Sequence, residues 1–166
     1  MFEKNDLVVY GIQGVCRIEG TVNRTLDDSP VAYYAMTPVY SPASTIYVPV
    51  GNPDLTARMK PILSAEELHA IIRELPELPS LWIPEESRRK QRFREVLLRG
   101  DRRELGALIG TLYRHRQAQQ ARGKKLHISD ERCLKDAERM LYSEFAVILH
   151  KLPEEIPAYI HGLLHP

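Results

Sequence analysis

The chain has 166 residues, of which 43% are hydrophobic and 27% are charged, and its formal net charge is +1. This composition is typical of a globular protein and excludes a disordered chain, and no apolar run reaches the roughly 20 residues that span a bilayer. The two cysteines, Cys16 and Cys133, have no paired spacing, so we expect reduced, packed thiols and neither a disulfide nor a zinc site.

Residues 1–50 predict a small antiparallel sheet. Short bursts rich in Val, Ile, Thr and Tyr alternate with turn residues such as Gly11, Gly14 and the run from Asp27 to Pro30. In so short a segment, closing the sheet into a barrel is an economical way to remove exposed edges. The stretch 51–54 reads as a turn.

After Pro61 the apolar period becomes helical. Ser64 and Glu67 have the spacing of a capping box, and three prolines at 76, 79 and 84 then interrupt the pattern. Further helices are predicted at 85–99, from Asp101, from Ser129 and after Pro153. The expected fold is α+β and multidomain, with an antiparallel β-barrel at 1–60, a helix and Pro-rich linker at 61–84, and an all-α bundle at 85–166, about five helices in all.

Basic residues are concentrated in the middle of the chain. Thirteen of the 23 lie between Ser87 and Lys125, where only three acidic residues oppose them, so this segment carries a net charge of +10. A polyanion responds to the local field, which favours nucleic acid as a partner. The candidate phosphate contacts are Arg88, Arg89, Lys90, Arg92, Arg99, Lys124 and Lys125. The alternatives are a solvated helical face, or an acidic protein partner without DNA contact.

Motifs of catalysis are missing from the sequence. There is no G-x-S-x-G, H-E-x-x-H, Walker or Rossmann pattern, and the six histidines lack the spacing of metal ligands. We therefore expect no enzyme activity, catalytic residue, cofactor, metal or small-molecule substrate. The N-terminal residues lack the apolar stretch of a signal peptide, which predicts a cytoplasmic protein without membrane contact.

Several segments resemble the CarD/CdnL family of bacterial transcription regulators. They are the stretch from Val8 to Ile18, Ser87-Arg88-Arg89, the stretch from Leu98 to Asp101, and the later Leu126, Asp130, Ala137-Glu138, Leu141 and Glu144-Phe145-Ala146. Their order and spacing together are more specific than any one of them. The resemblance covers nearly the whole chain.

The resemblance implies an SH3/Tudor-like barrel that docks on the RNA polymerase beta subunit. It also implies a helical domain that contacts promoter DNA, through the minor groove and the phosphate backbone, at the upstream edge of the transcription bubble. Such a protein stabilises the open complex without reading base sequence. It would be associated with the nucleoid through RNA polymerase, as a monomer on each polymerase.

Four residues are implied in polymerase binding. Arg24 matches a polymerase-contacting arginine of the family and would pair with a carboxylate, and Tyr47 falls where some relatives carry a second arginine. The expected docking edge, residues 31–48, also holds Tyr40 and Ile46. The alternative is that the tyrosines merely cover the sheet.

Trp82, the single tryptophan, has two possible roles. Family members insert a tryptophan near this point into the minor groove as a wedge, an insertion that costs a few kcal/mol of unstacking. Aligned on Ser-Arg-Arg, however, the wedge position falls at Glu86. Either Trp82 still reaches the groove, or it anchors the core, as most lone tryptophans do.

Overall fold

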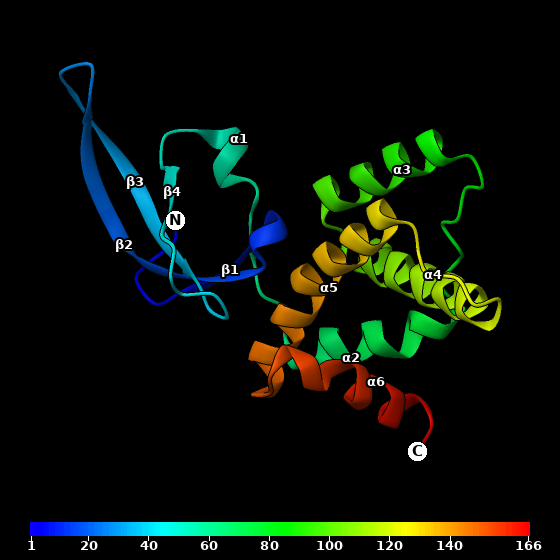
Figure 1. The fold of residues 1–166 in the computed structure, drawn as a ribbon. Coiled ribbons are helices and arrows are strands. Elements are labelled where there is room, and N and C mark those ends of the chain that lie inside the picture. The colour runs from blue at the N-terminus through cyan, green and yellow to red at the C-terminus, as the bar shows by residue number, and fades with distance from the viewer. The chain divides into compact units, whose positions relative to one another are not determined.

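The computed structural model describes residues 1–166 as two compact units, Met1–Ile62 and Leu63–Pro166, called here the sheet unit and the helical unit. Figure 1 shows their elements. No helix is both long and apolar enough to cross a membrane. The sheet unit contains β1 (Leu7–Tyr10), β2 (Val15–Leu26), β3 (Ser29–Pro38), β4 (Ile46–Pro49), α1 (Pro53–Thr56) and β5 (Met59–Pro61). The helical unit contains α2 (Ala65–Glu74), α3 (Glu86–Arg99), α4 (Arg102–Ala121), α5 (Ile128–Leu149) and α6 (Ile156–Leu164).

The sheet is antiparallel and open, which corrects the expectation of a closed barrel. Its strand order is β4-β3-β2-β1-β5, so β4 and β5 form the two edges. Both edge strands are short, four and three residues, and both end in a proline, Pro49 and Pro61. Short edges that contain proline offer few backbone groups to a stray strand, so the sheet manages its edges without closure.

The hairpin of β2 and β3 projects beyond the other strands of the sheet unit (Figure 1). Its turn consists of Asp27 and Asp28, with φ of 49° and 62°, between the paired residues Leu26 and Ser29. Two successive left-handed residues form the primed type of turn, whose twist matches that of the flanking strands. The register also shifts between Ile18 and Gly20, a bulge that bends β2.

A compact core lies on one face of the sheet. It contains Val8, Cys16, Ile18, Met36 and Val48, each at most 1% exposed. Burial raises the pKa of the Cys16 thiol to about 11, so this free cysteine is protonated and packs as an apolar group.

The segment expected to be only a turn holds α1, because the Asn52 side chain accepts the Leu55 N–H at 3.1 Å and caps a helix. The short strand β5, which follows α1, was not expected from the sequence.

Capping side chains and a left-handed glycine set the ends of helices in the helical unit. The capping box is present, with the Glu67 N–H donating to Ser64 and the Ser64 N–H donating to Glu67. Gly100 ends α3 in the left-handed conformation at φ 61°, and Asp101 caps α4. The helix expected from Ser129 begins at Ile128, because the side chain of His127 supplies the cap.

The Pro-rich segment is packed against α4 and is not a separate linker, which differs from the expected division at 61–84. Gly106 permits this approach, since a Cβ at that position would lie 2.5 Å from Leu75 Cδ2. The Leu81 N–H donates to Thr111 Oγ1 at 3.0 Å. Together with Leu68, Ile71 and Ile72 of α2, which are fully buried, this places the whole of 63–84 in the helical unit.

A buried carboxylate ties the start of the helical unit to its centre. Glu144 of α5 is 1% exposed and accepts the Leu63 N–H at 2.9 Å. Arg102 at the start of α4 donates to both Glu144 oxygens, at 2.9 and 2.7 Å. Charge-assisted bidentate bonds of this kind satisfy a carboxylate that would otherwise be costly to bury.

We expect Glu144→Ala to lower the free energy of unfolding by about 3 kcal/mol, since it leaves Arg102 and the Leu63 N–H without their buried acceptor. Urea unfolding monitored by circular dichroism measures this. Glu154→Ala, at an exposed position, is the control and should stay within about 0.5 kcal/mol of the parent. Equal urea midpoints for the two variants would contradict the role of Glu144 as a buried acceptor.

Candidate functional site

The sheet unit presents one exposed face that combines an arginine with apolar side chains. Alternate residues of a strand share a face, so Val22, Arg24 and Leu26 of β2 lie together. The Arg24 guanidinium lies over the ring of Tyr47 on β4, 3.9 Å from its centroid. Val22, Leu26 and Tyr47 are 38%, 58% and 39% exposed. We call these four residues the Arg24 face.

Contact with Tyr47 restrains Arg24. A cation over an exposed aromatic ring is stabilised by about 0.5–1 kcal/mol, enough to favour one orientation of a long side chain. Arg24 forms no ion pair in the chain, so its charge stays available to an acidic partner. Tyr47 therefore does more than cover the sheet.

The other two expected docking residues lie elsewhere. Ile46 stands opposite the buried Met36 in the β3–β4 register and packs against the core of the sheet, so its side chain is not on the Arg24 face. Tyr40 is 37% exposed and lies in the connection between β3 and β4. The structure brings together Arg24 and Tyr47 only.

The edge strand β4 offers backbone groups beside Tyr47. The Val50 N–H donates to the Ala32 carbonyl at 3.0 Å. Residues of an antiparallel strand bond alternately to the two sides, so Val48 and Ile46 bond toward β3 whereas Tyr47 directs its N–H and C=O outward. Pro49 has a carbonyl but no N–H to add. The edge can accept a short partner strand centred on Tyr47.

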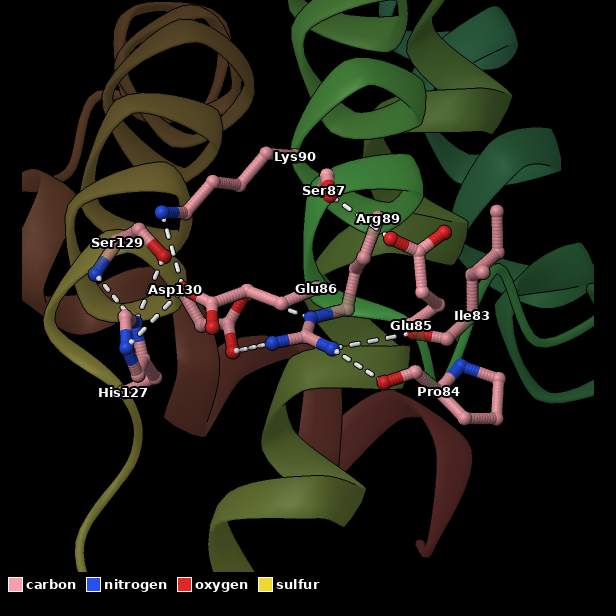
Figure 2. A network of polar contacts seen from close by, with 10 residues as sticks. All are labelled: Ile83, Pro84, Glu85, Glu86, Ser87, Arg89, Lys90, His127, Ser129 and Asp130. Atoms are coloured by element: carbon pink, nitrogen blue, oxygen red, sulfur yellow. Dashed lines mark hydrogen bonds and ion pairs between the residues drawn. The ribbon is translucent and has the colours of Figure 1, made fainter.

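In the helical unit, Arg89 is buried and holds two segments together (Figure 2). Its Nε and Nη2 donate to the two carboxylate oxygens of Asp130 on α5, both at 3.1 Å, and its Nη1 donates to the carbonyls of Ile83 and Pro84 at 3.1 and 3.2 Å. The side chains of Arg89 and Asp130 are 7% and 2% exposed. Arg89 is therefore a structural residue, which corrects its assignment as a phosphate contact.

The ring of Trp82 contacts one cation, the Arg89 guanidinium, and one aromatic ring, that of His115. The Arg89 guanidinium lies 4.3 Å from its ring centroid, and the His115 ring stacks on it at 3.7 Å with an interplanar angle of 22°. Trp82 is half-buried and packs against the helical core. Both wide faces of the indole are thus in contact within the chain, and stacking on a DNA base would require one of these neighbours to leave.

Two further expected phosphate contacts already have acidic partners. Lys90 pairs with Glu86 at 2.9 Å, and Glu86 also contacts His127 at 3.2 Å (Figure 2). At the other end of α3, Arg99 donates to both oxygens of Glu104 at 2.9 and 2.8 Å, and this arginine holds the pKa of the Glu104 carboxyl below its usual range. These pairs are exposed and add little to stability, but they reduce the charge offered to a polyanion.

Four of the expected phosphate contacts carry an unpaired charge. Arg88 is exposed and Arg92 half-buried, both on α3, and neither forms an ion pair. Lys124 and Lys125 are exposed in the turn after α4 and also form none. Of the phosphate contacts expected on α3, only Arg88 and Arg92 are therefore without an ion pair.

A basic hollow lies where α4 ends and α5 begins. Its cavity volume is about 560 Å³, and it is lined by Arg116 and Gln120 of α4, Lys125 and Leu126 of the turn, and Ile128, Glu131, Arg132 and Lys135 of α5. Sequence reasoning missed Arg116, Arg132 and Lys135 as functional candidates. The spacing i, i+4, i+7 of Ile128, Arg132 and Lys135 is the signal that could have grouped them on one face.

Comparison with known protein families gives one match. Residues 2–63 match the family model described as the CarD-like/TRCF RID domain. The matched residues coincide with the sheet unit, which confirms the family resemblance for that part of the chain. No curated protein matches the chain.

We expect Arg89→Ala to lower the free energy of unfolding by about 3 kcal/mol, because it leaves the buried Asp130 carboxylate unpaired. Its neighbour Arg88 is exposed, and Arg88→Ala should change stability by no more than about 0.5 kcal/mol. Urea unfolding followed by circular dichroism compares the two. A small effect of Arg89→Ala would contradict the structural role of this residue.

Proposed function

We propose that the protein regulates transcription by binding RNA polymerase and promoter DNA together, because its sheet unit matches the CarD-like/TRCF RID domain, an RNA polymerase-interacting domain. The sheet unit docks on the polymerase beta subunit. The helical unit contacts promoter DNA at the upstream edge of the bubble, without reading base sequence. The family match of residues 2–63 is the observation that carries this proposal.

The Arg24 face supports the docking step. Its arginine is oriented by Tyr47 and fits a carboxylate of the partner, and the outward N–H and C=O of Tyr47 can pair with an added strand. Val22 and Leu26 supply apolar contact area beside these polar groups. A tyrosine at the position of a second arginine replaces one ion pair with apolar contact and lowers the salt dependence of docking.

The unpaired cations of the helical unit support the DNA step. Arg88 and Arg92 lie on α3, and Lys124 and Lys125 in the turn after α4, and none of the four forms an ion pair. Contacts of this kind to phosphates supply affinity and orientation but carry no sequence information. They suit a protein that acts at many promoters.

The regulatory effect follows from differential affinity. A protein that binds the open promoter complex more tightly than the closed one shifts the population toward the open complex by the ratio of the two affinities. No catalytic step is needed, and we propose that the protein acts in the cytoplasm by binding energy alone.

Arg24→Glu should abolish co-purification of the full-length protein with core RNA polymerase, since it places a carboxylate where a carboxylate of the partner is expected. Tyr47→Ala should weaken the interaction severalfold, because it removes both the ring contact and the restraint on Arg24. Arg58→Glu, an exposed position after α1, makes the same charge change away from the Arg24 face and should bind normally. Normal binding by Arg24→Glu would refute the proposed docking face.

Arg88→Glu combined with Arg92→Glu should retain polymerase binding but lose stabilisation of the open complex, measured by permanganate reactivity of the melted bases. On free DNA, the slope of log K against log salt should fall in magnitude by about two, the number of phosphate contacts removed. Arg73→Glu with Arg139→Glu carries the same charge change elsewhere on the helical unit and serves as the control. Unchanged promoter melting in the first variant would eliminate the DNA step and favour an acidic protein partner.

A further inference from the structure

Ile128 is an exposed aliphatic residue set among cations. It is the first residue of α5, and 70% of its surface is exposed. Helical spacing places Arg132 and Lys135 on the same side of α5, and the turn before it carries Lys124 and Lys125. Single exposed hydrophobic residues are common on protein surfaces, so exposure alone would mean little.

What distinguishes Ile128 is its position on the rim of two hollows. The basic hollow between α4 and α5 is lined by four cations, Arg116, Lys125, Arg132 and Lys135, against the single carboxylate of Glu131. A second hollow, of about 440 Å³ between α3 and α5, is lined by Lys90 and Arg94 among others. Ile128 and Arg132 line both hollows.

The backbone that presents Ile128 is firmly held. His127 caps α5, with its Nδ1 accepting the Ser129 N–H at 3.4 Å. Two residues after Ile128, the Asp130 carboxylate is fixed by both donors of the buried Arg89 (Figure 2). The exposure of Ile128 is therefore a property of a fixed first helical turn and not of a loose loop.

We propose that this corner, defined by Arg116, Lys125, Ile128, Arg132 and Lys135, binds a strand of nucleic acid. The phosphates occupy the basic hollow, and Ile128 contacts the sugars and base edges beside them. The inference rests on the proposed function and deepens it, because it names a DNA surface outside α3 and an apolar contact within it.

Charge and shape favour nucleic acid over an acidic protein as the occupant. DNA carries one negative charge per about 1.7 Å of its axis, so it can place several phosphates beside the four cations that line the hollow. Proteins that enter the minor groove combine flanking cations with one inserted aliphatic or aromatic side chain, which is what this corner offers. An amphipathic acidic helix instead needs a row of apolar anchor positions, and the basic hollow supplies only Leu126 and Ile128.

The contacts that Trp82 makes within the chain favour Ile128 as the apolar residue that contacts DNA. The ring of Trp82 contacts Arg89 and His115, whereas Ile128 is 70% exposed. Ile128 can therefore enter a groove without rearrangement of the helical unit, which Trp82 cannot do without losing contacts within the chain.

Binding of the full-length protein to a labelled DNA fork without promoter sequence, followed by fluorescence anisotropy over a series of salt concentrations, tests the proposal. Ile128→Ser should weaken binding about tenfold through lost apolar contact, with an unchanged salt slope because no charge is removed. Arg132→Glu should weaken binding and reduce the slope in magnitude by about one. Leu98→Ser, at a position 74% exposed on α3, is the matched control and should bind as the parent does.

The outcomes separate this inference from the proposed function. If Ile128→Ser binds like Leu98→Ser, while Arg88→Glu with Arg92→Glu still weakens binding, the corner is not a DNA surface and the wider DNA step stands. If the parent protein binds no DNA, both fail. If Ile128→Ser and Arg132→Glu weaken binding to labelled polyglutamate but not to the fork, the occupant is an acidic protein and the inference is overturned. Circular dichroism of each variant confirms that the helical unit is folded.

Discussion

The buried ion pair of Arg89 and Asp130 is the constraint on which the helical unit depends. It joins the carbonyls that precede α3 to the first turn of α5, although Arg89 and Asp130 are 41 residues apart in the chain. Desolvation of two charges is costly and is offset here by four hydrogen bonds from Arg89, two to the Asp130 carboxylate and two to backbone carbonyls. The pair thereby holds the segment before α3 and the first turn of α5 together.

In both units, a cation is oriented by an aromatic ring, but with opposite consequences. Tyr47 restrains Arg24 at the surface of the sheet, so the charge is held ready for a partner. Trp82 covers a guanidinium that is already satisfied by Asp130, so that charge serves packing alone. Burial decides the difference, because a guanidinium can serve a partner only when its donors are not already committed within the chain.

Most of the fold followed from local signals in the sequence. The capping box at Ser64, the stop at Gly100 and the cap at Asp101 act within one helical turn and were predicted correctly. The open sheet was not predicted, since closure depends on the pairing of distant edges. The short elements α1 and β5 were not predicted either. Likewise Arg89 looked like its neighbour Arg88, because burial of an arginine depends on an aspartate 41 residues away. The charge density of 87–125 located the basic residues along the chain but did not reveal which cations are paired.

The single tryptophan of the chain sits between a guanidinium and an imidazole, and this has an optical consequence. With no second indole in the sequence, all tryptophan emission originates from one contact pair on the boundary of α3 and α4. The molecule carries a built-in fluorophore that reads out the packing of its helical half without any label.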